Sequence, residues 1–208
     1  MWLRFMVILL LLPHQSREHE LNFTLPGQLA LFLDRIGYAH RLHAISIVNS
    51  RDSIDPDYLD DLHRQLRANA SMHFQLLPQM TATDVDAQVR FSALLDENSL
   101  YVVFARNSRD PVIRLQAQRA RGRRYSKTLF LLKHHEPYSA LEEFFKLLWQ
   151  LQFRSALVVV AQRWFYQMDP YPKMIVKRMR GISLYHLQQI FPQPTRKNFN
   201  GYELHLPV

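Results

Sequence analysis

The chain has no cysteine among its 208 residues. This absence excludes thiolate catalysis, cysteine-ligated zinc and any disulfide framework. Glycine is also scarce, with five residues. Neither a G-x-G-x-x-G nor a G-x-x-x-x-G-K pattern occurs, so the sequence predicts no glycine-rich loop for a nucleotide phosphate. No apolar run reaches the about 20 residues that a membrane-spanning helix needs.

The composition is that of a folded, basic domain. Hydrophobic residues make up 48% of the chain, which is enough to form a core. The length corresponds to one domain with a short tail. The net charge of +8 and the pI of 9.9 favour contact with nucleic acid, an anionic membrane or an acidic partner.

The N-terminus has the order of a secretory signal peptide. Arg4 supplies a positive charge, residues 5–12 are wholly apolar, and residues 13–16 turn polar. We therefore expect residues 1–16 to be a signal peptide that directs the chain into the secretory pathway. The alternative is a buried N-terminal strand.

Two glycosylation sequons agree with a secreted chain. Asn22 stands in Asn-Phe-Thr and Asn69 stands in Asn-Ala-Ser, so both are glycosylation candidates. Each is expected to lie on the surface.

Short apolar segments alternate with amphipathic ones along residues 28–160. We expect strands at residues 44–48, 72–77, 100–104, 128–132 and 156–160. We expect helices at residues 28–36, from residue 56, at 83–95, at 112–121, and from residue 139 with a capping box. This alternation predicts an α/β fold, with a mostly parallel sheet and helices on both faces. After Trp164 the pattern changes, and we expect a turn, a short helix at 184–190 and a linker at 191–194.

Candidate catalytic and metal-binding groups are weak. No serine stands in a G-x-S-x-G elbow. The glutamates at 142–143 fall in an expected first helical turn, where negative charge is favourable without any catalytic role. The histidine pairs at 40 and 43 and at 134–135 lack a third ligand at a suitable spacing. We therefore expect no enzyme, no metal site and no cofactor.

A basic run is the main local feature that invites a binding role. Its members, which we treat as a candidate basic interaction surface, are Arg114, Arg119, Arg121, Arg123, Arg124 and Lys127. The favoured interpretation is a solvated helix face and loop, with the arginines of the helix pointing outward. The alternative is a phosphate-contacting surface on an intracellular nucleic-acid-binding module. For a secreted chain no nucleic-acid partner is expected.

The second half of the chain resembles a known family in the order of its features. An apolar strand at 128–132 precedes a helix that ends Leu-Leu-Trp at 147–149. A valine-rich strand at 156–161 then leads to the aromatic run at 164–172, and the chain closes with Asn-Phe-Asn-Gly-Tyr at 198–202. This order resembles the extracellular N-terminal region of divergent insect ionotropic chemosensory receptors, which are relatives of the ionotropic glutamate receptors. The resemblance is clearest from residue 123 to 207.

The resemblance implies a periplasmic-binding-like lobe without catalytic activity. Residues 17–190 would form the extracellular N-terminal domain, and residues 191–208 would form a linker and the first strand of a ligand-binding domain. In a full-length ligand-gated ion channel the domain would assist ligand detection or subunit assembly. Its partners would be other receptor subunits and a small-molecule ligand, at the extracellular face of the plasma membrane. A stand-alone secreted binding protein is a further alternative.

The sequence departs from the family at its end. The Asn-Gly turn at 200–201 and the alternation at 202–206 predict that a strand is just beginning, so we expect the chain to be the front portion of a longer receptor. The ligand-binding lobes and the pore of the family have no counterpart in these residues. No binding or pore residue of the family can therefore be assigned to this sequence.

Overall fold

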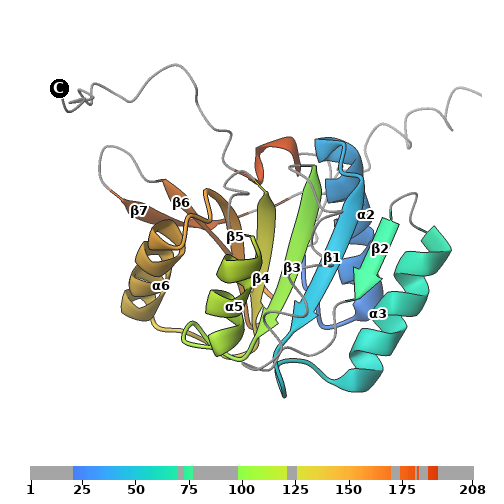
Figure 1. Cartoon of the computed structure of the whole chain (residues 1–208), viewed down its shortest axis with the longest axis horizontal. Helices are drawn as coiled ribbons and strands as arrows, with labels where there is room; N and C mark the ends of the chain where they lie inside the picture. Colours follow the sequence, from blue (N-terminus) through green and yellow to red (C-terminus); the bar gives the residue numbers. More distant parts are fainter. Residues whose placement is uncertain are drawn as a thin grey trace, which may run out of the picture.

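The computed structural model describes residues 21–69, 73–76, 98–120, 126–169, 174–180, 182 and 187–191 (Figure 1). The helices are α2 (Pro26–His40), α3 (Pro56–Asn69), α5 (Pro111–Arg119), α6 (Tyr138–Gln150) and the 3₁₀ turn η2 (Leu187–Gln189). The strands are β1 (Ala44–Asn49), β2 (His73–Leu76), β3 (Ser99–Ala105), β4 (Lys127–Leu132), β5 (Ser155–Val160), β6 (Trp164–Asp169) and β7 (Ile175–Met179).

The strands form one sheet in the order β2-β1-β3-β4-β5-β6-β7. The first five are parallel, and β6 and β7 are antiparallel to their neighbours. Ile45 of β1, for example, pairs with Leu100 of β3, which is 55 residues further along the chain. The expectation of an α/β fold with a mostly parallel sheet is confirmed.

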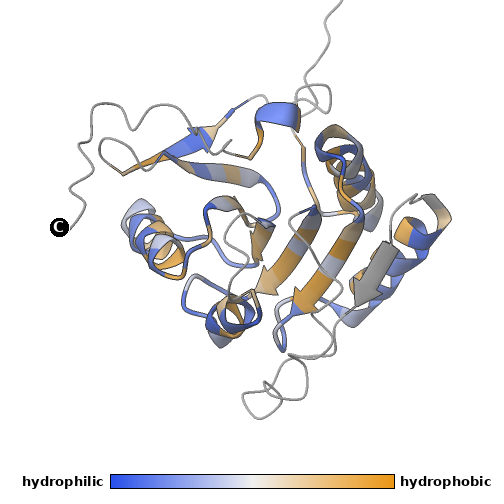
Figure 2. Ribbon diagram, turned by 45° about the horizontal axis from the view of Figure 1, so that its top comes forward, coloured by the Kyte–Doolittle hydropathy of each residue, from blue (hydrophilic) through white to orange (hydrophobic). Residues whose placement is uncertain are grey.

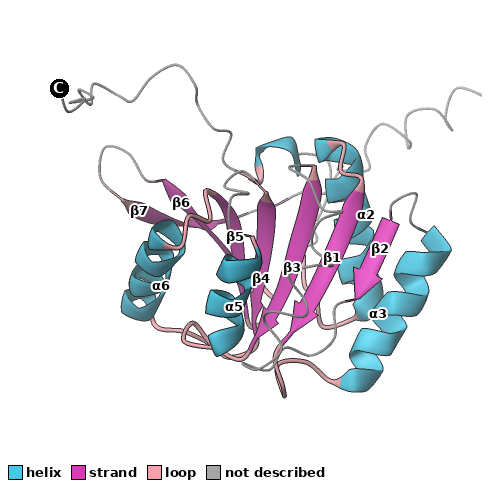
Figure 3. Ribbon diagram, viewed as in Figure 1, coloured by secondary structure: helices cyan, strands magenta, loops and turns pink. Residues whose placement is uncertain are grey.

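Helices cover both faces of the sheet (Figure 3). On one face α2 and α3 pack against a core that includes Leu100 and Val102 of β3. On the other face α5 and α6 pack against a core that includes Val103 of the same strand. All seven residues of β3 are buried, because a strand covered on both sides has no solvent face. The apolar strands in the middle of the sheet stand out in the hydropathy view (Figure 2).

An aromatic anchor joins the residues before α2 to the sheet. Phe23 is fully buried, and its ring contacts Phe32 and Phe165 with centroids 4.8 and 5.4 Å away. Its backbone N–H donates to the Gln162 carbonyl oxygen at 2.8 Å. Its carbonyl oxygen accepts from the Tyr58 hydroxyl at 2.6 Å. The segment that leads into α2 is therefore fixed to α3 and to the turn after β5.

Several local expectations need correction. The capping box expected at Ser139 does not form, because α6 begins at Tyr138 after Pro137, and no side chain caps it. After Trp164 a turn and a short helix at 184–190 are expected but no strand, whereas the structure has β6 and β7 there, and the 3₁₀ turn η2 lies within the expected helix. Phe191, expected to open a linker, is 2% exposed and belongs to the core on the α2 side. The helix expected at 83–95 lies outside the described residues.

Candidate functional site

The carboxyl ends of the parallel strands form the candidate site. In Figure 1 this edge is the lower one, where the arrowheads point. From β1 the chain goes to β2 on one side and then to β3 on the other, so the strand order reverses between β1 and β3. In open α/β sheets, ligands bind outside the carboxyl ends of the strands at such a reversal. The loops that follow β1, β3 and β4 lie at this edge.

Asp110 is the centre of this edge. It follows β3, is 4% exposed, and caps α5 by accepting from the Val112 N–H at 3.1 Å. Its Oδ2 atom accepts from the Ser50 hydroxyl at 2.6 Å and from the Arg106 backbone N–H at 2.9 Å. The Arg106 Nε lies 3.4 Å from the same oxygen. The Asp110 carboxylate thus joins the loops after β1 and β3, and it also caps the N-terminus of α5.

The neighbouring loop, after β4, is attached in the same way. Lys133 donates through Nζ to the Asp52 carbonyl oxygen at 2.9 Å. Glu136 accepts from the Ser108 N–H at 2.8 Å through Oε1. Asp52 itself has φ 61°, a left-handed conformation that Asn and Asp tolerate better than most residues. The loops after β1, β3 and β4 therefore form one connected surface, because these hydrogen bonds join each loop to another.

Exposed cations surround this surface. Arg51, Arg106, Arg109 and Lys133 all reach solvent, whereas Asp110 is buried and already neutralised by its partners. Guanidinium and ammonium groups of this kind bind carboxylates and phosphates. The edge is suited to hold a small anion by charge and hydrogen bonding.

The edge does not have the arrangement of a nucleophilic catalytic site. The Ser50 hydroxyl donates its proton to a carboxylate that already accepts two backbone N–H groups. A serine nucleophile needs a base within hydrogen-bond reach that is free to take the proton. In the described part of the chain, no three His, Asp or Glu side chains gather as metal ligands.

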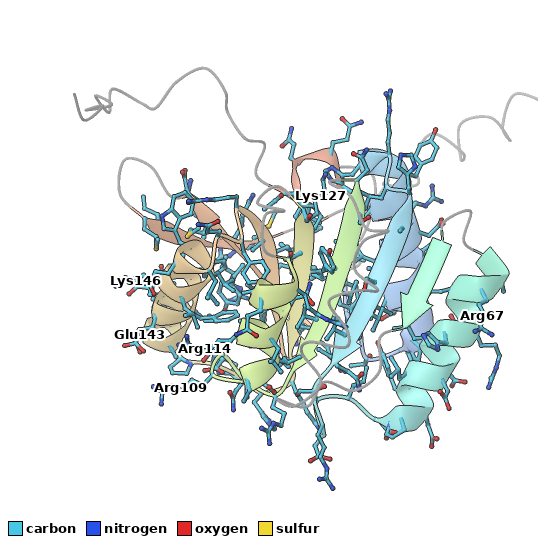
Figure 4. The ribbon with its side chains drawn as sticks, viewed as in Figure 1. Arg67, Arg109, Arg114, Lys127, Glu143 and Lys146 are labelled. Atoms are coloured by element: carbon cyan, nitrogen blue, oxygen red, sulfur yellow. The ribbon has the colours of Figure 1, made fainter. Side chains whose placement is uncertain are left out.

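The candidate basic interaction surface is only partly described, and its described members do not meet. Arg114 is exposed on α5, and Lys127 is half-buried at the start of β4. Figure 4 shows Arg109 and Arg114 toward one end of the sheet and Lys127 toward the other. Arg121, Arg123 and Arg124 lie outside the described residues.

Arg119 corrects the expectation for this run. It was expected to point outward, but it is 5% exposed and faces the sheet from α5. Burial lowers the pKa of its guanidinium, and the nearby Tyr101 acts in the opposite direction. Tyr101 belongs to a polar row across the sheet, in which it pairs with Ser46 of β1 and Thr128 of β4. A buried arginine cannot contact a nucleic-acid backbone, so Arg119 itself is not part of an exposed basic surface.

The glycosylation candidates lie on different elements. Asn22 is half-buried, and its Oδ1 accepts from the Thr24 N–H at 3.1 Å. Asn69 is the last residue of α3, and its side chain lies outside the described part. The expected signal peptide at 1–16 and the expected strand at 202–206 also fall on residues that are not described. None of the described helices has the length and apolar character needed to cross a membrane.

Sequence reasoning missed Asp110, although a signal was present. The expected helix at 112–121 leaves out Asp110 and Pro111, although an Asp-Pro pair is a helix-start signal. The helix expected from residue 56 follows the same pair, Asp55-Pro56, and both helices begin at the proline. A consistent use of this signal would have identified the α5 cap. It would not have identified Ser50 as its partner, because that contact spans 60 residues.

No protein-family model matches the chain, and no curated protein matches it.

Proposed function

We propose that the chain is the extracellular, non-catalytic N-terminal domain of an ionotropic-receptor-like chemosensory protein. In this proposal the domain is a periplasmic-binding-like lobe that contributes to ligand detection or subunit assembly. The main observation in support of this proposal concerns the four features of the family resemblance. They coincide with β4, α6, β5 and β6, which are consecutive in the chain. Three of them, β4, β5 and β6, are also adjacent in the sheet.

The strand order supports the lobe assignment. The first five strands follow the order 2-1-3-4-5, which is one of the two common doubly wound arrangements. The fold alone carries no function, since such sheets serve many activities. The functional part of the proposal therefore depends on the resemblance and on the polar edge around Asp110.

The chemistry of that edge favours an anionic small molecule as the ligand. Arg51 follows β1 and Arg109 follows β3, and both are exposed. Lys133 is held near Arg51 by its bond to the carbonyl oxygen of the next residue, Asp52. A carboxylate ligand could accept from these groups without displacing the internal hydrogen bonds of Asp110. In the proposal, such a ligand bridges the loops after β1 and β3.

Ligand binding tests the detection role. The chain would be titrated with a panel of small carboxylates, and the melting temperature would be followed, because a ligand of the folded state raises it. Arg51→Ala combined with Arg109→Ala should abolish the shift, whereas Arg67→Ala on the outer side of α3 should leave it intact (Figure 4). If no carboxylate shifts the melting temperature, or if the Arg67 variant loses the shift equally, the ligand-detection role is wrong.

The receptor assignment has a separate test. The full-length transcript would be sequenced across the codon for Val208. A reading frame that continues into ligand-binding lobes and membrane-spanning segments supports the assignment. A longer frame that encodes neither overturns it, whatever the outcome of the binding titration.

A further inference from the structure

Two buried polar atoms lie at the amino ends of β4 and β5. Ser126 directly precedes β4 and is 3% exposed, and Arg154 directly precedes β5 and is half-buried. Within the described part of the chain, neither the Ser126 Oγ atom nor the Arg154 Nη1 atom makes a hydrogen bond, although both atoms are buried. Buried polar atoms are almost always hydrogen-bonded in folded proteins, so each exception calls for a physical explanation.

The register of the sheet places these two residues side by side. Lys127 of β4 pairs with Ser155 of β5 at the start of the two parallel strands. Ser126 and Arg154 are the residues just before this pair, and neighbouring strands are about 4.8 Å apart. The two unbonded atoms therefore belong to adjacent side chains, and they are not bonded to each other.

Both side chains face the helix α6. The Arg154 guanidinium carbon lies 3.6 Å from the centre of the Trp149 ring, which is near the end of α6. Side chains alternate along a strand, so Ser126 faces the same side as Phe130, which belongs to the core beneath α6. The Trp149 ring holds the guanidinium in place beside the serine hydroxyl, since a planar guanidinium stacks well on an aromatic face.

The positive charge of Arg154 has no acceptor among the described residues. No described carboxylate forms an ion pair with it. The last carbonyl groups of α6, at Leu147, Leu148 and Trp149, accept from the backbone N–H groups of residues 151–153 instead. A partly buried charge is costly unless a partner of opposite charge or a hydrogen bond offsets it.

We infer that Ser126 and Arg154 form a binding site for a small oxyanion, such as a carboxylate or a sulfate-like group. An anionic oxygen would accept from the Nη1–H group of Arg154 and from the Ser126 hydroxyl, and its charge would offset that of the guanidinium. A water molecule could accept the same two hydrogen bonds but would leave the charge without a counterion. Because Arg154 is only half-buried, an ion can reach it from solvent.

This site is separate from the edge around Asp110. It lies at the amino ends of the strands, next to Lys127, which Figure 4 shows at the opposite end of the sheet from Arg109. The inference does not depend on the proposed receptor function.

Anion titrations of the full chain test the site. The melting temperature would be followed as sodium sulfate or sodium acetate replaces sodium chloride at constant ionic strength, because an ion that binds the folded state raises it. Ser126→Ala should weaken the binding by at least about tenfold, since it removes a hydrogen bond to a charged group, and Arg154→Gln should abolish it. Arg178→Gln is the matched control, because Arg178 also lies 3.6 Å from a tryptophan ring, that of Trp164, but is exposed.

The two anions distinguish the kind of group that binds. A shift with acetate identifies a carboxylate site, and a shift with sulfate alone identifies a site for tetrahedral anions. The inference is overturned if neither anion shifts the melting temperature, or if Arg178→Gln loses the shift as Arg154→Gln does.

Repeating the titrations with Arg51 and Arg109 both replaced by alanine separates this site from the proposed ligand site. A shift that persists in this double variant, and disappears when Arg154→Gln is added, belongs to the amino ends of β4 and β5. A shift that the double variant abolishes by itself contradicts the inference.

An NMR titration of the wild type covers the case in which the Ser126 or Arg154 variants do not fold. The Ser126 amide and the Trp149 indole N–H should shift together along one saturable curve. The indole N–H of Trp164, which contacts the exposed Arg163 and Arg178, is the internal control and should stay unchanged. Equal shifts at both indoles, or no shift at Trp149, would show that no such site exists.

Discussion

Replacement of Asp110 by alanine tests the account of the carboxyl edge most directly. The carboxylate is 4% exposed and accepts from the Ser50 hydroxyl, the Arg106 N–H and the Val112 N–H. Loss of the helix cap costs about 1 kcal/mol. Loss of a hydrogen bond to a charged group costs about 1.5–3 kcal/mol, and the buried partners are left unsatisfied. We expect Asp110→Ala to lower the free energy of unfolding by about 3–5 kcal/mol, which is a large share of the about 5–15 kcal/mol of a typical domain.

Equilibrium unfolding in urea measures this loss, with Asp57→Ala as the control. Asp57 is an exposed aspartate in the first turn of α3, next to a helix N-terminus as Asp110 is, so its loss should cost no more than about 1 kcal/mol. A double-mutant cycle with Ser50→Ala should give a coupling energy above about 1 kcal/mol. If Asp110→Ala costs no more than Asp57→Ala, or if the coupling energy is near zero, the central role of Asp110 is refuted.

Three further changes test other parts of the fold. Leu157→Ala should lower the free energy of unfolding by about 2–5 kcal/mol in urea, because Leu157 is fully buried in β5. Tyr58→Phe should cost about 1–2 kcal/mol by removing the donor to the Phe23 carbonyl. Burial raises the pKa of Tyr58, so above pH 10 its phenol ionises in the unfolded chain before it does in the folded one. The wild type should therefore lose folding stability above pH 10, and unfolding experiments at alkaline pH should show a smaller loss of stability in Tyr58→Phe. Gly27→Ala should change stability by less than about 1 kcal/mol in a thermal melt, since the new Cβ meets only the mobile amide end of Gln65 at 2.7 Å and the helix gains propensity.

The central part of the fold could be predicted because its elements are buried on both faces. The strands around Leu100 and Leu157 consist of uninterrupted apolar residues, which is typical of a parallel sheet covered by helices. The apolar face of α6, including Leu141 and Phe144, also lies in the core as its spacing indicates. Where burial is the main force, local pattern and tertiary structure agree.

The edge strand β7 could not be predicted, because it has little of the burial that makes the central strands recognisable. β7 has one buried residue, Val176, among exposed and half-buried ones. Its position depends on pairing with β6 and on the Tyr138 hydroxyl, which donates to the Val176 carbonyl at 2.9 Å. These contacts are tertiary and leave no periodic signal in the sequence.

The candidate site could also be predicted only in part from the sequence. The positive charge of the edge is visible in the sequence. The burial of Arg119 is not, because an arginine on a helix is normally expected to face solvent. The Ser50–Asp110 contact depends on the pairing of β1 with β3, which brings their loops together. Long-range register therefore decides which polar residues meet.

The turn between β5 and β6 has a consequence for the kinetics of folding. Ala161 and Gln162 both adopt positive φ, at 49° and 58°, and this tight connection lets β6 pair directly with the strand before it. Pairing of Ile45 with Leu100 instead requires closure of a much longer loop. Local hairpins form in about 1–10 μs, whereas long-range parallel pairing is slow. We expect the β5–β6 end of the sheet to form first and the addition of β1, which creates the candidate site, to limit the rate.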